Sequence, residues 1–426
     1  MKKEFIPPHN HDSIDFIAPI DPIGVLSELI AYPTITPQEC GIYTFIQSLL
    51  PDFESLHINA GGRDGDEVKN LFLFKRFGQA QTNQSGHNDS EDGKAKPLHF
   101  CFAGHIDVVP PGNGWQSDPF VPEIRGEYLY GRGAQDMKGG VSAFLCALRD
   151  FLRANTPKTP VIFSVLLTSD EEGSGTYGTK IVLEALKQKG LLPDMAIVAE
   201  PTCDKRLGDT IKIGRRGSIN GIITIKGIQG HVAYPEKCHN PVELLGARLG
   251  ELAGVFLDDG DEDFAPSKLV ITDIRGGMEA VNVTPSDLKI MFNVRNSTKT
   301  HLSDVRCHIE NVLDGLPYDL DLKQSSYPFL TSSDGALAGL LQNAVHKTCG
   351  VYPEFSTGGG TSDARHFSAF GVEVIEFGTC NDKIHSVDEC VNIRDLNLLY
   401  ETFMNFLSSL YQVQVLQAQS IKKEIK

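Results

Sequence analysis

The sequence predicts an α/β protein that carries a smaller α+β segment within it. In the first half, short apolar runs alternate with segments of helical spacing, an order typical of a partly parallel sheet. After Gly214 the order changes to strand, helix, strand, strand, helix. From about Ser332 the pattern of a helix followed by a strand returns. The length of 426 residues allows two or three domains, so we expect one larger domain interrupted by a smaller one.

The first half supplies alternating helices and strands. Residues 1–20 contain Pro and His without periodicity, and we expect an N-terminal extension there. Residues 78–96 are rich in Gln, Asn, Ser, Gly and Asp, which is typical of a surface loop. Apolar spacing predicts helices over 23–32, 141–152 and 179–189. Buried-type apolar runs predict strands over 71–74, 98–103, 160–167 and 195–199.

The second half supplies the smaller domain and then completes the larger one. We expect strands over 218–228, 269–274 and 287–293, with helices over 241–256 and near 303–313. A strand over 373–377 and a helix over 393–411 end the chain. The predicted larger domain is therefore discontinuous, 21–215 and 331–426, with the smaller domain at 216–330.

Composition excludes several classes of protein. The 39 basic and 55 acidic residues give a net charge of −16, which disfavours nucleic acid and anionic membranes as partners. Nine scattered cysteines without a Cys-x-x-Cys pair argue against a disulfide framework and against a thiolate zinc site. The N-terminus does not match a signal peptide, and no apolar run approaches eighteen residues. We therefore expect a cytoplasmic protein.

Histidine and acidic residues follow the predicted strands. A single Asp after a strand is more often a helix cap, and a single His is more often structural, but five such positions at strand ends are improbable as coincidence. Ligands of open α/β sheets bind beyond the carboxyl ends of strands. The residues concerned are His105 and Asp107, Asp136, the pair Glu171 and Glu172, Glu200, and His385.

The residue types in this constellation indicate a dinuclear metal site. Two histidines and three carboxylates without cysteine suit two zinc-type ions bridged by one carboxylate. Amide hydrolysis at such a site also needs a carboxylate that binds no metal and accepts the proton of the attacking water. Neighbouring side chains diverge, so one of Glu171 and Glu172 can bind metal while the other faces substrate.

Five motifs make the chain similar to the co-catalytic zinc aminoacylase and carboxypeptidase family, over about 23–406. They are Gly104-His105-Ile106-Asp107-Val108-Val109-Pro110, Asp136-Met137-Lys138-Gly139, Gly214-Arg215-Arg216-Gly217-Ser218, Lys226-Gly227-Ile228-Gln229-Gly230-His231-Val232-Ala233-Tyr234-Pro235 and Gly358-Gly359-Gly360-Thr361-Ser362-Asp363. The resemblance implies a zinc-peptidase-like catalytic domain with a mixed, largely parallel sheet. It also implies that the inserted α+β domain is ferredoxin-like and serves for dimerisation.

The resemblance also assigns roles to residues. It implies two Zn²⁺ ions per subunit, for which Co²⁺ can substitute, with Asp136 as the bridge. His105 and Glu200 would complete one shell, and Glu172 and His385 the other. Asp107 would orient His105 through a carboxylate-to-imidazole contact. Glu171 would be the general base, and His231 of a homodimer partner would stabilise the oxyanion.

Substrate choice depends most on the resemblance. Within the family, the motifs are most similar to those of members that hydrolyse N-succinyl-LL-2,6-diaminopimelate in lysine biosynthesis. That substrate is multiply anionic, and guanidinium groups bind carboxylates bidentately. The positions that match substrate contacts are Arg215, Tyr234, Asn282, Arg295, Gly360 and Thr361.

Two other readings stay open. An N-acetylornithine deacetylase, an aminoacylase or a dipeptidase of the same fold would use the same metal site, and the motifs around Arg215 and Thr361 favour the succinyl substrate over these. A non-catalytic metal-binding or interaction protein on this scaffold would lack the general base, whereas Glu171 is present. For Arg215 and Ser218, the structural alternative is that they order the hinge between the domains, and for Gly358-Gly359-Gly360 it is that they form a turn.

Overall fold

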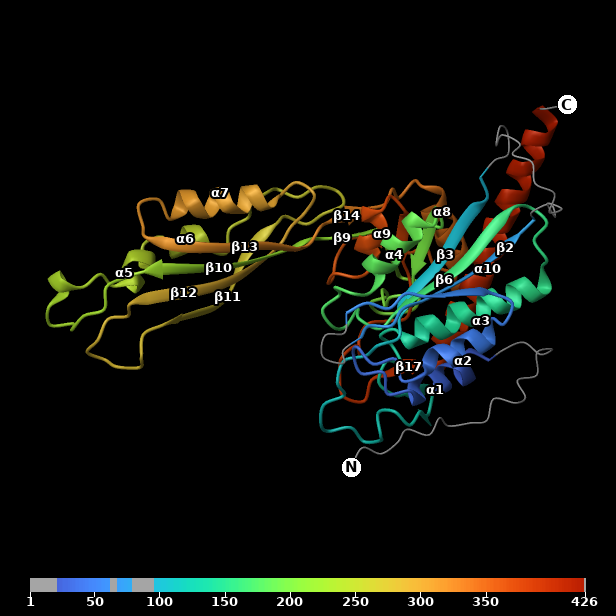
Figure 1. The fold of residues 1–426 in the computed structure, drawn as a ribbon, viewed down its shortest axis with the longest axis horizontal. Coiled ribbons are helices and arrows are strands. Elements are labelled where there is room, and N and C mark those ends of the chain that lie inside the picture. The colour runs from blue at the N-terminus through green and yellow to red at the C-terminus, as the bar shows by residue number, and fades with distance from the viewer. Residues whose placement is uncertain (1–20, 62–66, 79–95, 425–426) are drawn as a thin grey trace. The chain divides into compact units, whose positions relative to one another are not determined.

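The computed structural model describes residues 21–61, 67–78 and 96–424 (Figure 1). The predicted extension at 1–20 and most of the predicted loop at 78–96 lie outside these residues. The chain divides into two compact units. Unit 1 comprises Met1–Ile213, Thr331–Phe355 and Ser362–Lys426, and unit 2 comprises Gly214–Leu330 and Ser356–Thr361.

Unit 1 is built on an eight-stranded mixed sheet with strand order β1-β2-β6-β3-β7-β16-β8-β15. The central pairs β6–β3, β3–β7 and β7–β16 are parallel, whereas β1–β2, β2–β6 and β16–β8 are antiparallel. This arrangement confirms the predicted fold class. The strands are β1 (Glu54–His57), β2 (Leu71–Phe77), β3 (Leu98–His105), β6 (Val161–Thr168), β7 (Met195–Val198), β8 (Thr210–Lys212), β15 (Glu354–Ser356) and β16 (Glu373–Glu376).

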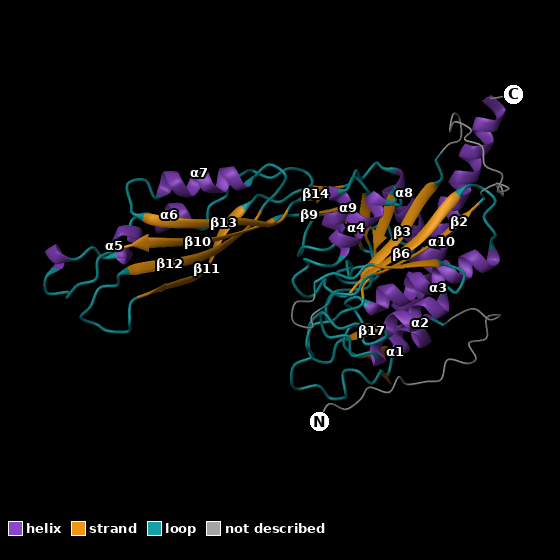
Figure 2. Cartoon of the chain, viewed as in Figure 1, coloured by secondary structure: helices purple, strands orange, loops and turns teal. Residues whose placement is uncertain are grey.

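Helices cover this sheet, as the ribbon in Figure 2 shows. The Phe102 ring of β3 stacks on Phe144 of α3 at 5.1 Å between centroids and meets Phe403 of α10 at 5.0 Å. The helices are α1 (Pro22–Ala31), α2 (Ile42–Leu49), α3 (Lys138–Ala154), α4 (Thr179–Gln188), α8 (Ala336–Cys349), α9 (Ala364–Ala369) and α10 (Ile393–Glu424). Within the described ranges, none of the helices combines the length and apolar character needed to cross a bilayer.

A small three-stranded sheet lies beside the turn that precedes α3 in the chain. Its order is β17-β5-β4, and both pairs are antiparallel. The strands are β4 (Glu123–Arg125), β5 (Tyr128–Tyr130) and β17 (Cys390–Asn392). Because β5 precedes Asp136 and β17 follows His385 in the chain, the pairing brings these two segments together.

Unit 2 is an antiparallel four-stranded sheet of order β11-β12-β10-β13, with helices packed on one face. Alternate residues of β12, from Leu288 to Val294, are buried against these helices. The strands are β10 (Ser218–Lys226), β11 (Lys268–Gly276), β12 (Asp287–Arg295) and β13 (Tyr318–Ser326). The helices are α5 (Pro241–Gly246), α6 (Leu249–Leu252) and α7 (Leu302–Val312), with a 3-10 turn at Pro235–Lys237 and a two-stranded ribbon of β9 (Gly214–Arg215) and β14 (Phe329–Leu330).

Two features of unit 2 differ from the sequence-based prediction. The expected helix over 241–256 is two short helices, because Gly246, Gly250 and Gly254 disfavour a continuous one. Unit 2 also includes Ser356–Thr361, which the sequence placed in the larger domain. The Arg215 guanidinium donates a hydrogen bond to the Gly358 carbonyl at 3.1 Å, which ties this segment to unit 2.

Candidate active site

Three parallel strands of unit 1 end at the same edge of the sheet. His105 is the last residue of β3, Glu171 and Glu172 lie three and four residues after β6, and Glu200 follows β7. Asp136 lies in the turn before α3. Carboxyl ends of parallel strands meet at one edge of a sheet, so the predicted histidine and acidic residues that follow these strands lie at that edge.

The first group of possible ligands is His105, Asp136 and Glu200, whose ligand atoms lie within 4.8 Å of one another. His105 Nε2 is 3.2 Å from Asp136 Oδ1. The His105 side chain is only 1% exposed. The first group therefore has a buried histidine, and two of its three residues lie at or just after the ends of β3 and β7.

The second group is Asp136, Glu172 and His385, within the same 4.8 Å limit. His385 Nε2 lies 2.9 Å from Glu172 Oε1 and 3.3 Å from Asp136 Oδ2. The His385 side chain is 49% exposed, and its φ of 58° lies in the left-handed region. Asp136 turns one carboxylate oxygen to each group, so it is the residue that both groups share.

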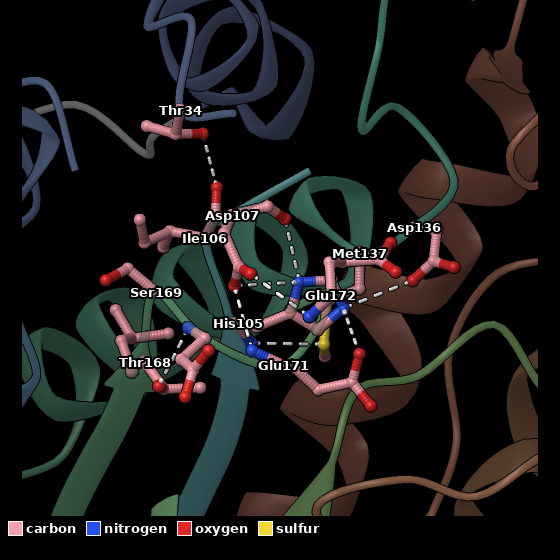
Figure 3. Close-up of polar contacts among 12 residues, drawn as sticks. Thr34, His105, Ile106, Asp107, Asp136, Met137, Thr168, Ser169, Glu171 and Glu172 are labelled. Carbon is pink, nitrogen blue, oxygen red and sulfur yellow. Dashed lines mark hydrogen bonds and ion pairs between the residues drawn. The ribbon is translucent and has the colours of Figure 1, made fainter. Parts of the chain in front are cut away.

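Asp107 orients His105 in a way that differs from the prediction (Figure 3). The nearest partner of His105 Nδ1 is the Asp107 carbonyl oxygen at 2.9 Å, whereas the carboxylate lies 3.6 Å away. A carbonyl only accepts, so Nδ1 carries the proton and Nε2 is left to bind a cation. The carboxylate instead accepts the backbone N–H groups of Glu171 and Glu172, at 3.4 and 3.1 Å.

Glu171 belongs to neither ligand group but lies beside the first. Its Oε2 atom is 4.0 Å from His105 Nε2. Burial, together with the negative charge of Glu200, raises the pKa of the Glu171 carboxyl well above its usual value. An acid whose pKa is raised by its surroundings can both accept and return a proton near neutral pH.

The two histidines are strongly influenced by the surrounding carboxylates. Burial alone would lower the pKa of His105, but the hydrogen bond with Asp136 and the charge of Glu200 outweigh it and raise that pKa well above its usual value. Hydrogen bonds with Asp136 and Glu172 raise the pKa of His385 to about 10. The pKa of Asp136 is lowered by the same two histidines, although burial opposes this. In the absence of metal, protons on the histidines thus offset the carboxylate charge.

The donor set fits divalent ions of the zinc type. It consists of imidazole nitrogens and carboxylate oxygens, the ligands that zinc takes in catalytic sites. The three carboxylates of the two groups carry more negative charge than two neutral imidazoles can offset, so cations complement the site.

The predicted substrate residues all lie in unit 2. His231 and Tyr234 lie close together, with 6.0 Å between ring centroids, and the Asn282 carbonyl accepts the N–H of Val232 at 3.2 Å. Arg215 is buried and bonded to Gly358. Burial and the charge of Arg216 lower the pKa of Arg295. Gly360 and Thr361 follow Gly358 in the segment 356–361.

The sequence of the chain matches a family model described as peptidase family M20/M25/M40 over residues 101–409. The chain belongs to this family. It is 55% identical over 391 residues to the succinyl-diaminopimelate desuccinylase of Helicobacter pylori strain P12, covering 92% of this chain and 99% of the relative. It is 52% identical over 385 residues to the protein of the same name from Wolinella succinogenes, covering 90% and 98%.

Solved structures share the M20 fold at low sequence identity. Aminopeptidase PepT from Bacillus cereus superposes with a TM-score of 0.70 at 16% identity, covering 92% of this chain and 98% of that one. The Bacillus subtilis YXEP protein, described as a dinuclear metal-binding peptidase of the M20 family, has a TM-score of 0.65 at 14% identity and covers 92% and 98%. These likenesses show the fold.

Sequence reasoning missed buried charged residues within the region that matches the family model. Lys138 is fully buried and donates to the carbonyls of Leu29 and Tyr32, at 2.8 and 2.9 Å. Burial lowers its pKa to about 7. Glu389, four residues after His385, is buried as well. The available signal was a charged residue flanked by apolar and small ones, as in Met137-Lys138-Gly139.

Proposed function

We propose that the protein hydrolyses the amide of N-succinyl-LL-2,6-diaminopimelate to succinate and LL-2,6-diaminopimelate, in lysine and diaminopimelate biosynthesis. One observation carries the proposal: two ligand groups that share Asp136 occur in a chain 55% identical, over 92% of its length, to proteins named succinyl-diaminopimelate desuccinylase. The non-ligand acid Glu171 beside these groups supports a hydrolytic reaction.

The cofactors in this proposal are two Zn²⁺ ions per subunit, for which Co²⁺ can substitute. His105, Asp136 and Glu200 would hold one ion, and Asp136, Glu172 and His385 the other. When bound, such ions polarise the amide carbonyl and lower the pKa of water.

The chain's own residues then move protons and orient groups. Glu171 accepts a proton from the attacking water. It later donates that proton to the amine nitrogen as the amide C–N bond breaks, so Glu171 ends the reaction as a carboxylate again. Asp107 supports both partners, because its carbonyl orients His105 and its carboxylate holds the backbone of Glu171. His231 donates a hydrogen bond to the oxyanion.

Substrate recognition falls to unit 2 in this proposal. Arg215 and Arg295 bind carboxylates of the multiply anionic substrate, since a guanidinium presents a planar pair of donors. Tyr234, Asn282, Gly360 and Thr361 supply further contacts. Arg215 is held in place by its bond to Gly358, which supports a fixed orientation of the guanidinium.

The test of substrate class is a direct comparison with the purified protein. Initial rates are measured on N-succinyl-LL-2,6-diaminopimelate and on N-acetylornithine, with Zn²⁺ added and after chelation. We expect the succinyl substrate to be turned over faster, and both activities to disappear with chelator. Faster turnover of N-acetylornithine would instead favour the deacetylase of the same fold.

We also propose a homodimer in which His231 acts on the partner subunit's active site, with 216–330 as the dimerisation domain. Inactive His231→Ala and Glu171→Ala proteins are mixed under conditions that exchange subunits. In hybrid dimers one site retains both Glu171 and His231, so part of the activity should return. No recovery despite verified exchange would contradict action between subunits.

A further inference from the structure

The carboxylate of Glu389 is a buried centre of four hydrogen bonds. Oε2 accepts from Arg132 Nη1 at 2.7 Å and from the Gly133 N–H at 3.0 Å. Oε1 accepts the N–H groups of Gln135 and Asp136, at 2.9 and 3.0 Å. The side chain is 1% exposed. These four donors occupy the four lone-pair positions of one carboxylate, and they fix the backbone of the turn that carries Asp136.

Gln135 forms a second link between the same two segments. Its side-chain Nε2 donates to Asp382 Oδ1 at 2.8 Å, and its Oε1 accepts the Lys383 N–H at 2.7 Å. Its carbonyl oxygen also accepts from Thr379 Oγ1 at 3.1 Å. The segment 379–389, which carries His385, is thus attached to the turn 132–136 on both sides of His385.

The two ligand groups need this attachment to different extents. His105 ends a strand with parallel partners on both sides, and Glu200 lies two residues after another strand of the same sheet. His385 lies in a loop, half exposed and with a left-handed backbone. The pairing of β5 with β17 brings its segment near Asp136, but His385 itself is in no strand, so its final distance to Asp136 also depends on the side-chain contacts of the loop.

We propose that Glu389 and Gln135 are positioning residues that hold His385 against Asp136 and so set the affinity of the second group for its divalent ion. The inference rests on the proposed dinuclear site and deepens it. Neither residue touches the reacting atoms, and both act through the distance between two ligands. Changes at outer partners of ligands typically cost ~10–100-fold in metal affinity.

Two substitutions separate this role from a general loss of folding. Glu389→Gln keeps the shape of the side chain, but its amide group must face two of the four donors, so donors oppose donors. Gln135→Met keeps the length and burial of residue 135 while removing both side-chain hydrogen bonds. It leaves no buried charge without a partner, because Asp382, which loses the Gln135 donor, is exposed. Asp388→Asn is the matched control, because Asp388 contacts Gln116 and Arg125 but is not bonded to the 132–136 turn in any described contact.

The measurement is a calorimetric titration of each metal-free, full-length protein with Zn²⁺, repeated with Co²⁺ and its visible absorption. For Glu389→Gln we expect the Kd of the second ion to rise ~10–100-fold, while that of the first changes by less than about threefold. Gln135→Met should shift the second Kd in the same direction by more than about threefold. Asp388→Asn should match the wild type for both ions.

Thermal unfolding of the metal-free proteins shows which variants are folded. If Glu389→Gln is not folded, the Kd values of Gln135→Met alone decide the test. The proposal is overturned if the folded variants bind the second ion as tightly as the wild type, or if both ions are weakened alike. Wild-type protein that binds fewer than two ions would contradict the proposed dinuclear site itself. If the wild type binds two ions and the variants bind both with unchanged Kd values, only the positioning role is contradicted.

Discussion

The two ligand groups share Asp136 but are built in different ways. The first group places a 1% exposed His105 at the end of a strand in the centre of the sheet. The second places a 49% exposed His385 in a loop, where side chains such as Gln135 supply the attachment. A strand end is fixed by the hydrogen bonds of the sheet, whereas a loop ligand needs dedicated partners. In the proposed dinuclear site we therefore expect the second ion to be the more easily lost.

The largest expected effect concerns the acid that belongs to neither group. Glu171→Ala should lower kcat by about 10³-fold or more, because removing a general base costs ~10²–10⁴-fold. Asp107, the other non-ligand acid described beside His105, lies on the Nδ1 side of the ring and accepts backbone N–H groups, so it does not replace Glu171. Both ions should remain bound, as measured by metal analysis of the same sample. Near-normal turnover with both ions present would remove Glu171 from its proposed role.

Removal of the shared ligand should differ from removal of an unshared one. Asp136→Ala should weaken both ions by more than about 100-fold, since it deletes a donor from each group. His385→Ala should weaken only the second ion. Equilibrium dialysis with Zn²⁺ gives both constants. If His385→Ala released both ions equally, the distinction between a strand-based and a loop-based group would be broken.

Lowering the pH should reduce the free energy of unfolding through a buried histidine in β3, the strand that ends at His105. His99 near the start of β3 is buried and contacts Ser164 Oγ at 2.7 Å, and burial lowers its pKa to about 4 from 6.5. His99 binds a proton more tightly in the unfolded chain than in the folded one. Its contribution to the free energy of unfolding is therefore fully present above pH 6.5 and is lost as the pH falls toward 4, by about 3 kcal/mol at most. Urea unfolding of the metal-free protein at several pH values measures this loss.

The control for this effect is His99→Gln, which cannot titrate. Its free energy of unfolding should differ from that of the wild type by a constant amount above pH 6.5. Between pH 6.5 and 4 the difference should shrink, because only the wild type loses the contribution of a neutral His99. Parallel curves over that whole range would show that His99 does not cause the loss.

Proton competition should affect the second group over the neutral range. His385 has a pKa of about 10 without metal, so below pH 10 an incoming ion must displace a proton. The apparent affinity of the second ion should fall about tenfold for each pH unit from 9 to 7. Calorimetry in two buffers of different ionisation enthalpy counts the released protons. A His385→Ala protein that kept the same slope would assign the proton to another group.

Much of the larger domain follows from local patterns. The helix expected over 23–32 and the strand over 160–167 agree with α1 and β6 to within about one residue, because their apolar residues repeat at the period of the element they form. The helix expected over 241–256 is wrong as one element, since its three glycines weaken it. Helix α2, with Ile42, Phe45, Ile46 and Leu49 at helical spacing, had a readable signal that the prediction did not use.

The candidate site shows where sequence reasoning ends. Residue types and strand-end positions pointed to the histidines and acids of the two groups, because metal chemistry restricts the ligands and parallel strands share an edge. The sequence could not reveal that His105 is oriented by the Asp107 carbonyl, since that depends on the path of the chain after β3. The roles of the substrate residues in unit 2 stay predictions.

The sequence by itself thus determined the fold class, the family motifs and the kinds of ligand, each of which depends on local periodicity or on a short run of residues. Only the tertiary structure decided that Asp136 faces both groups and that Glu389 receives four donors from a turn more than 250 positions earlier in the chain. Such contacts join segments far apart in sequence, and their geometry exists only once the sheet and its loops have packed.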